Sequence, residues 1–280
     1  MSTHQAAAER EMVAGTALLD GARDYAQEVL ALTTRWWIEL RRDRLNLLFN
    51  LVQPAVWMVF FGIGVGKTVD KSVIGTHDYI GFMLPGIIAF TIVGNGINSA
   101  MPLMWDKETG YLDKLMSMPI ARSSVIVSRF VFQTALNSVQ VLIMVGVALL
   151  LDVRIRSNAG GVVVILLVGA LLTLAFTAIF AALAYRVANH GTYFAVTGFI
   201  TLPLLFMSNA FVPLHAMPRW MEIIARLNPL TYAITAMRTL VLDGWEMSIG
   251  TPLVVLTVIA LAFLALGTMQ FRRLTGQRAN

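Results

Sequence analysis

Long apolar stretches without charge alternate with short polar segments along the whole chain. Each of six windows lacks Asp, Glu, Lys and Arg and runs for 22 to 29 residues: Leu45–Gly66, Tyr79–Trp105, Phe130–Leu151, Ser157–Tyr185, Gly191–Leu214 and Met247–Gln270. A helix of about 20 mostly apolar residues crosses the hydrocarbon core of a bilayer. The pattern therefore predicts an all-α membrane protein with six transmembrane helices, at about residues 45–66, 79–105, 122–151, 158–186, 191–213 and 248–270.

Composition agrees with this class. Of the 280 residues, 57% are hydrophobic and 13% are charged, about half the ~25% of a typical soluble domain. The absence of cysteine excludes a disulfide framework, a thiolate metal site and a cysteine nucleophile. The four histidines are scattered without metal-ligand spacing, and no catalytic constellation is present, so we do not expect an enzyme.

The basic residues predict the orientation in the membrane. With the N-terminus inside, 14 of the 21 Lys and Arg residues fall on the cytoplasmic side, as the positive-inside rule expects. We therefore predict a multi-pass protein of the plasma (inner) membrane with both termini in the cytoplasm, including cytoplasmic tails at residues 1–44 and 271–280.

The segment before the first span has helical periodicity. Apolar positions recur at intervals of three and four residues: Tyr25, Val29, Leu32, Trp36 and Leu40. Trp36 and Trp37 adjoin a basic cluster and are typical of interfacial anchors, which favours an amphipathic helix along the inner leaflet. A soluble helix packed on a partner is the alternative.

Two connecting segments also have helical patterns. The pattern of residues 106–118 predicts a short cytoplasmic helix that docks a partner. A solvated connector would also explain the charges of this segment. Its apolar and charged positions are Leu112, Asp113, Lys114, Leu115 and Met116. Between the fifth and sixth spans, residues 214–243 contain two helices, Pro218–Leu227 and Leu230–Leu242, each too short to cross. They predict a re-entrant hairpin in the outer leaflet, whose backbone ends require cover by protein.

One glycine-rich segment, Gly62–Thr68, is similar to the end of a phosphate-binding loop. The pattern requires a glycine where Phe61 stands, and the segment follows a membrane span instead of a strand. We therefore exclude nucleotide binding on this chain.

The spans contain amides in place of charges. Gln133, Asn137 and Gln140 share one helix face, and Asn95 and Asn98 share another. In hydrocarbon such amides either bond between helices or line a wet path, and the sequence leaves both open. Because the windows lack charged groups, ion-coupled transport through side chains is disfavoured. Ion coupling through the backbone carbonyls of broken helices remains an alternative.

Three blocks of sequence are similar to the membrane subunits (permeases) of ABC type-2 exporters. They are Arg35–Trp57, Asp78–Gly86 with Glu108–Arg122, and Ser208–Trp220 with Leu227–Ala233 and Arg238.

The resemblance implies roles for particular residues. Contact with an ATPase would involve Arg42, Glu108, Leu112, Asp113, Lys114, Leu115 and Met116. A substrate path would involve Asn95, Asn98, Gln133, Asn137, Phe206 and Asn209. An outer gate would involve Phe211, Pro213, Pro218, Trp220, Asn228, Pro229 and Tyr232.

The resemblance also implies partners. Two ABC ATP-binding subunits would hold ATP and Mg, while this chain holds no cofactor, and a second permease copy or paralogue would complete the transporter in the lipid bilayer. No nucleic acid is expected. The predicted function is export of amphiphilic cargo (drug, lipid or lipid-linked glycan) by alternating access. The alternatives are a stand-alone secondary transporter or channel and, within the class, a polysaccharide or O-antigen export permease.

Overall fold

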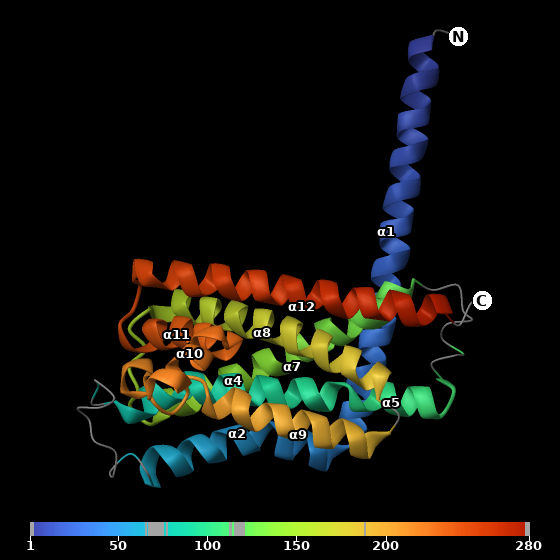
Figure 1. The fold of residues 1–280 in the computed structure, drawn as a ribbon. Coiled ribbons are helices and arrows are strands. Elements are labelled where there is room, and N and C mark those ends of the chain that lie inside the picture. The colour runs from blue at the N-terminus through green and yellow to red at the C-terminus, as the bar shows by residue number, and fades with distance from the viewer. Residues whose placement is uncertain are drawn as a thin grey trace.

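The computed structural model describes residues 3–64, 66, 76, 78–111, 114, 121–187 and 189–277. This part of the chain contains helices and no strand, which confirms the all-α prediction. In chain order the elements are α1 (Thr3–Arg42), α2 (Arg44–Gly64), α4 (Tyr79–Ser99), α5 (Met101–Glu108), α7 (Arg122–Leu150), α8 (Asn158–Arg186), α9 (His190–Phe206), η1 (Leu214–Ala216), α10 (Arg219–Leu227), α11 (Pro229–Leu242), η2 (Met247–Ile249) and α12 (Gly250–Gln277). Figure 1 shows the long apolar helices lying side by side, with α1 crossing one end of the bundle.

Five stretches of helix are long and apolar enough to cross a membrane. They are Arg44–Gly64, Tyr79–Glu108, Ser123–Leu150, Asn158–Arg186 and Met247–Gly267. The second joins α4 to α5 through Ala100. The helix in the place of the predicted fifth span, α9, has 17 residues and a length of about 26 Å. It ends at Phe206, before the expected boundary at residue 213.

Helix α4 forms the centre of the bundle. In the most apolar 18-residue window of the stretch Tyr79–Glu108, which contains α4, 72% is buried. The corresponding windows of α2 and of Met247–Gly267 are 11% and 22% buried. A helix that is apolar on all sides is stable only when it is surrounded by other apolar groups. Neighbouring helices supply them for α4, since α2, α7, α8 and α11 all contact it.

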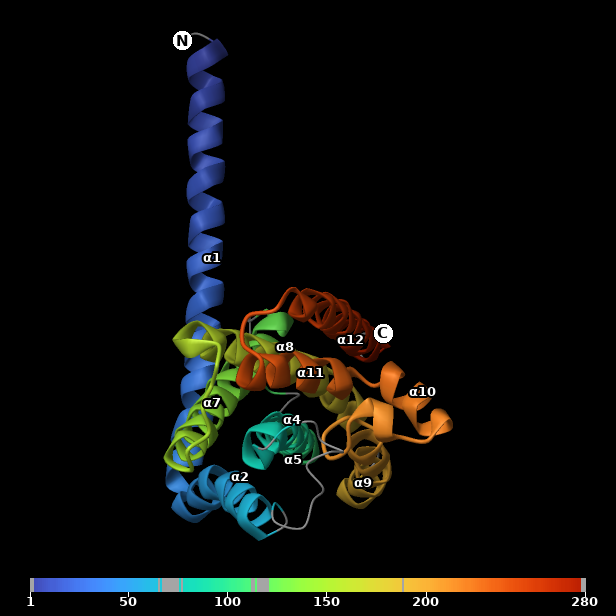
Figure 2. The ribbon, with the colours of Figure 1, turned by 90° about the vertical axis from the view of Figure 1, so that its left-hand side faces the viewer.

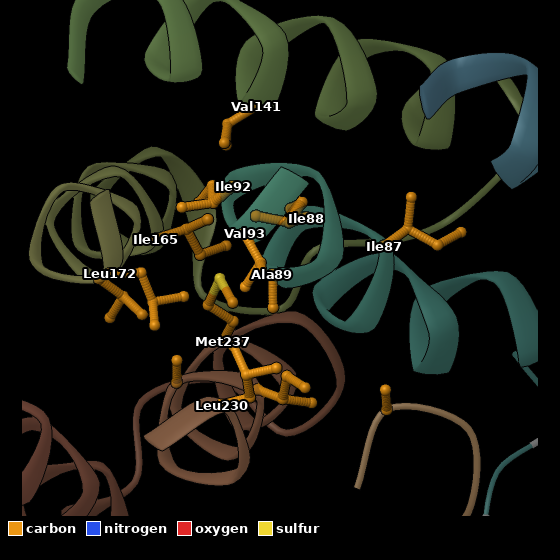
Figure 3. Packing of buried hydrophobic residues seen from close by; sticks show 14 of the residues in the cluster. Ile87, Ile88, Ala89, Ile92, Val93, Val141, Ile165, Leu172, Leu230 and Met237 are labelled. Carbon is orange, nitrogen blue, oxygen red and sulfur yellow. The ribbon is translucent and has the colours of Figure 1, made fainter. Parts of the chain in front are cut away.

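The core brings residues from distant parts of the chain together. Ile88 and Ile92 of α4 pack in one cluster with Ile165 of α8 and with Leu230 and Met237 of α11 (Figure 3). All five side chains are almost fully buried. Helix α11 is therefore part of the bundle core at the end opposite α1 and is too short, at about 21 Å for 14 residues, to span a bilayer of ~30 Å.

The C-terminal part of helix α1 packs against α7, whereas its N-terminal part extends away from the bundle (Figures 1 and 2). Trp36 is 6% exposed and packs with Phe132 and Leu136 of α7. Trp36, predicted as an anchor at the membrane surface, is thus buried in the contact between α1 and α7, and its depth in the membrane stays a prediction. Its neighbour Trp37 makes an edge-to-face contact with Phe132 at 5.2 Å between ring centres.

Arg129 is a charged side chain inside one of the spanning helices. The charge-free window begins at Phe130, but α7 begins at Arg122, so Arg129 belongs to the helix. Its guanidinium stacks on the ring of Trp36 at 3.8 Å and donates a hydrogen bond to the carbonyl oxygen of Ser99. Arginine tolerates such a place because its planar group combines ring stacking with directed hydrogen bonds.

Candidate functional site

A cavity of about 450 Å³ opens between α2, α4 and α9. None of the described residues in its wall is charged. Amides and apolar or aromatic side chains alternate in the lining, which consists of Asn50, Gln53, Pro54, Trp57, Phe61, Gly86, Ile87, Phe90, Thr91, Gly94, Asn95, Asn98, Gln140, Leu202, Leu205, Phe206 and Phe211. Ligand sites of this size are typically apolar with a few placed polar groups.

Glycines on α4 set the shape of this cavity in two ways. A Cβ atom at Gly94 would meet no atom within 4 Å, so the missing side chain leaves open space. A Cβ atom at Gly86 would lie 3.1 Å from Ala210, so this glycine allows a close backbone approach instead. The cavity is therefore wide near Gly94 and closed near Gly86.

Aromatic side chains gather at the Gly86 end. Phe211 lies 6.5 Å from Phe61 of α2 and 5.9 Å from Phe206 of α9, between ring centres. Trp57 stacks on Phe61 at 5.5 Å. Phe206 was predicted on the substrate path and Phe211 in the outer gate, and the structure brings the two rings into contact.

A buried network of amides forms the back wall. The Nδ2 atom of Asn95 donates to Asn137 Oδ1 at 2.7 Å and to Gln140, and Asn137 Nδ2 donates to Thr173 Oγ1 at 2.7 Å. Gln140 continues the network to the carbonyl oxygen of Asn50 at 2.7 Å. These bonds join α2, α4, α7 and α8. All the residues of the network except Asn50 are buried. Each amide that finds a partner here avoids the free energy of an unsatisfied group in hydrocarbon.

The network separates the predicted path residues into two groups. Asn137 and Gln133 bond to each other at 3.3 Å and do not line the 450 Å³ cavity. Asn98 lines the cavity and is exposed, and no side-chain hydrogen bond of Asn98 occurs among the described residues. Of the predicted path residues, Asn98 is therefore the amide most available to a solute.

A second cavity, of about 240 Å³, shares Asn50, Asn95 and Asn98 with the first. Its remaining wall comes from α1, α2, α4, α5 and α7, at the end of the bundle that α1 crosses, and contains both aromatic and charged side chains. Trp36, Glu39, Asp43, Trp105, Arg129 and Gln133 are among them. The shared residues place the two cavities end to end along α4.

Asn228 organises the segment that follows α9. Its Nδ2 atom donates to the carbonyl oxygens of Leu204 at 2.6 Å and Met207 at 3.0 Å, and its Oδ1 accepts from the N–H of Leu230 at 3.0 Å. One side chain thus satisfies carbonyls at the end of α9 and caps the start of α11. These bonds account for the end of α9 before residue 213.

Further bonds attach the same segment to α11. Asn209 Nδ2 donates to Thr235 Oγ1 at 2.8 Å, so this predicted path residue belongs to the contact with α11 and does not line either of the two cavities. The hydroxyl of Tyr232 donates to the carbonyl oxygen of Arg226 at 2.6 Å, which joins α11 to α10.

The other predicted gate residues begin or cover short helices. Pro213 precedes η1, Pro218 precedes α10, and Pro229 is the buried first residue of α11. The side chain of Trp220 is 60% exposed on α10. Arg238 of α11, a partly buried arginine, was not among the predicted site residues; its signal in the sequence was a lone charge between Leu230 and Leu242.

The predicted ATPase-contact residues that the structure describes, Arg42, Glu108 and Lys114, lie at the end of the bundle that α1 crosses. Glu108 ends α5, and its Oε1 lies 2.9 Å from Nδ1 of His190 at the start of α9. Lys107 donates to the carbonyl oxygens of Tyr185 and Val187 at 3.2 and 3.3 Å. Arg42 ends α1, and Lys114 is exposed. The remaining contact residues, Leu112, Asp113, Leu115 and Met116, lie outside the described residues.

Comparison with known proteins decides the family. Residues 27–242 match the ABC-2 type transporter family, which is more than half of the 280 residues. The chain belongs to this family. This match confirms the predicted family, and the protein is a membrane permease of the ABC-2 transporter family. Permease subunits of such transporters work with ATP-binding subunits and are not themselves catalytic.

Curated relatives are permeases as well. The chain is 36% identical over 214 residues to the putative transport permease ycf38 of Porphyra purpurea, covering 76% of this chain and 73% of that protein. It is 29% identical over 219 residues to the daunorubicin resistance ABC transporter permease protein DrrB1 of Streptomyces coeruleorubidus, covering 77% and 76%. It is 26% identical over 226 residues to the probable doxorubicin resistance ABC transporter permease protein DrrC of Mycobacterium tuberculosis, covering 80% of each.

Proposed function

We propose that this ABC-2 permease forms the membrane pathway of an ATP-driven exporter for amphiphilic cargo. The observation that carries the proposal is the pair of cavities along α4, which share an amide-lined wall and end at an aromatic cluster. Apolar rings suit the hydrophobic part of a cargo, and the free amide of Asn98 suits a polar group. Two relatives named for daunorubicin and doxorubicin resistance support a drug or another amphiphile as cargo.

In this proposal the chain has six spans, with α9 and the residues after it as the fifth. Both termini face the cytoplasm across the plasma membrane, α1 follows the inner leaflet, and α10 with α11 forms a re-entrant hairpin behind the outer gate. A second permease copy or paralogue completes the path, since a single bundle leaves large apolar side chains of α2 and α9 exposed.

Energy comes from two ATP-binding subunits that hold ATP and Mg. They contact residues 106–118 and the end of α1 at Arg42, and closure of the ATPase pair shifts the bundle from inward to outward access. ATP shifts this equilibrium only through its different affinity for the two states. Asp substitutions at Leu112 and Leu115 should therefore weaken ATPase binding and reduce export.

Two other functions make different predictions. A stand-alone secondary transporter or channel would move cargo without the ATPase, driven by an ion gradient; the wall of the larger cavity offers no charged group for such coupling among the described residues. A polysaccharide or O-antigen permease would use the aromatic side chains to stack on sugar rings.

The test is transport by purified permease, with and without its ATPase, in liposomes loaded with a fluorescent amphiphile. Phe206→Ala and Asn98→Ala should each reduce ATP-dependent transport at least several-fold. The matched control is Phe199→Ala, on the same helix, whose side chain is 80% exposed and lines neither cavity. Transport driven by an ion gradient alone would refute the proposal, as would equal transport by the Phe206 and Phe199 variants.

A further inference from the structure

A third cavity lies apart from the larger, 450 Å³ cavity and shares no lining residue with it. Its volume is about 290 Å³, and its walls come from α1, α5, α7, α8 and α12, whereas the larger cavity lies among α2, α4 and α9. In Figure 2, α12 and α2 lie on opposite sides of α4. Trp36 and Arg129 line both this cavity and the 240 Å³ cavity and so form the partition between them.

Small side chains on α8 create the space. Ala178, Ala181 and Ala182 follow at intervals of three and one, so they share the helix face that lines the cavity. Leu32 of α1 and Leu264 of α12 complete an almost wholly apolar wall. An apolar cavity of this kind excludes water and favours hydrocarbon.

One end of the apolar space is positively charged. The charged side chains in its wall are Arg35, Arg129 and Asp106, and Arg35 Nη2 bonds to Asp106 Oδ1 at 3.1 Å. Both guanidinium groups stack on Trp36, at 4.6 Å for Arg35 and 3.8 Å for Arg129. Glu39 also acts electrostatically on Arg129, but it lines the neighbouring 240 Å³ cavity. The wall of the 290 Å³ cavity thus has one positive charge in excess.

Buried donors at this end have no acceptor. Nη1 of Arg35, Nε1 of Trp36 and the hydroxyl of Thr177 are buried without a hydrogen-bond partner among the described residues. Trp36 and Thr177 are 6% and 5% exposed, so bulk water does not satisfy them. Buried polar groups are nearly always bonded, and three orphan donors beside an apolar cavity indicate an acceptor that is supplied from outside the chain.

We infer that this cavity binds an anionic phospholipid of the leaflet in which α1 lies. Part of an acyl chain occupies the alanine-lined space, and the phosphate oxygens accept hydrogen bonds from Arg35 and Trp36. Charge complementarity selects an anionic headgroup, because a zwitterionic lipid brings a cation of its own toward the two arginines. The lipid fills the junction of α1 with α7, α8 and α12 and stabilises the position of α1, independently of which cargo the permease moves.

Native mass spectrometry of the purified full-length permease tests this site. The protein, delipidated in detergent, is titrated with phosphatidylglycerol and, separately, with phosphatidylcholine. We expect one phosphatidylglycerol to bind at least about tenfold more tightly than phosphatidylcholine, the effect of one charge-assisted hydrogen bond. Arg35→Gln should abolish the preference, and Arg35→Lys should restore part of it. The matched control is Arg41→Gln, which removes a positive charge from an exposed position of the same helix.

A second variant addresses the acyl chain. Ala182→Leu fills the apolar space and should reduce binding of phosphatidylglycerol about tenfold, whereas Ala159→Leu, at an exposed position near the other end of α8, should leave it unchanged. Equal binding of the two lipids by the wild-type protein would overturn the inference. A preference for phosphatidylglycerol that Arg41→Gln reduces as much as Arg35→Gln does would overturn it too, because the lipid would then respond only to net charge.

Discussion

Arg238 of α11 donates a hydrogen bond from Nε to the carbonyl oxygen of Phe82 in α4, at 3.1 Å, across 156 positions of sequence. Its Nη2 donates to the carbonyl oxygen of Ala210 at 3.2 Å, and its guanidinium lies 3.8 Å from the centre of the Phe82 ring. One side chain therefore ties together the central helix, the hairpin and the segment after α9. No ion pair of Arg238 occurs within the described ranges.

Replacing Arg238 by methionine should destabilise the protein. The substitution keeps an unbranched apolar side chain, which is shorter, but removes the donors of two hydrogen bonds at a partly buried position, so we expect a loss of roughly 1–3 kcal/mol in the free energy of unfolding. Arg238→Lys should lose less, since one donor and the charge remain. Thermal unfolding in detergent measures the effect, with the exposed Arg219→Met as control. A melting temperature equal to that of the control would refute the role of Arg238.

The amide network should likewise be a structural element. Asn137→Ala removes the partner of Asn95, Gln133 and Thr173 in the interior, and we expect it to lower the free energy of unfolding by roughly 1–3 kcal/mol. Asn98→Ala removes no side-chain hydrogen bond among the described residues and should change stability by less than about 0.5 kcal/mol. Denaturant unfolding of both variants separates the two roles. Similar losses of unfolding free energy in the Asn98 and Asn137 variants would contradict the assignment of Asn137 to the structural network and of Asn98 to the transport path.

Sequence periodicity predicted this fold well where a helix interior is uniformly apolar, as in α8, whose bounds agree at both ends. It was less accurate for α9, because the end of that helix depends on Asn228, which is distant in sequence. The shared face of Asn95 and Asn98 was evident, but their different surroundings were not: Asn95 meets α7 while Asn98 meets the cavity. The contacts of Trp36 with Arg129 and Phe132 of α7 were equally inaccessible, because they join residues that are distant in sequence.

Filling the space at Gly94 should block transport without unfolding the protein. A Cβ atom there meets nothing within 4 Å, so Gly94→Leu fits into the 450 Å³ cavity and obstructs it. Replacing a helical glycine also removes a backbone entropy penalty of about 0.5–1 kcal/mol, so stability should be maintained or increased. The expected result is a loss of at least tenfold in ATP-dependent transport at an unchanged melting temperature. Gly146→Leu is the control, since that glycine of α7 is equally free of neighbours but lines neither transport cavity. If both leucines reduce transport equally, the cavity is not the path.

Glu108 offers a test of communication with the ATPase. Its carboxylate lies 2.9 Å from His190 Nδ1, so it connects the end of α5 with the start of α9, one wall of the transport cavity. The pair is partly exposed, and Glu108→Gln should therefore change the free energy of unfolding by no more than about 1 kcal/mol. If movement of the 106–118 segment reaches α9 through this contact, the variant should transport less cargo per ATP hydrolysed, while the ATPase stays bound. The control is Glu222→Gln, which breaks another surface pair, with Arg226 of α10, at the opposite end of the bundle. The measurement is the ratio of cargo transport to ATP hydrolysis in liposomes, and an equal ratio for both variants would show that the Glu108–His190 contact does not carry the coupling.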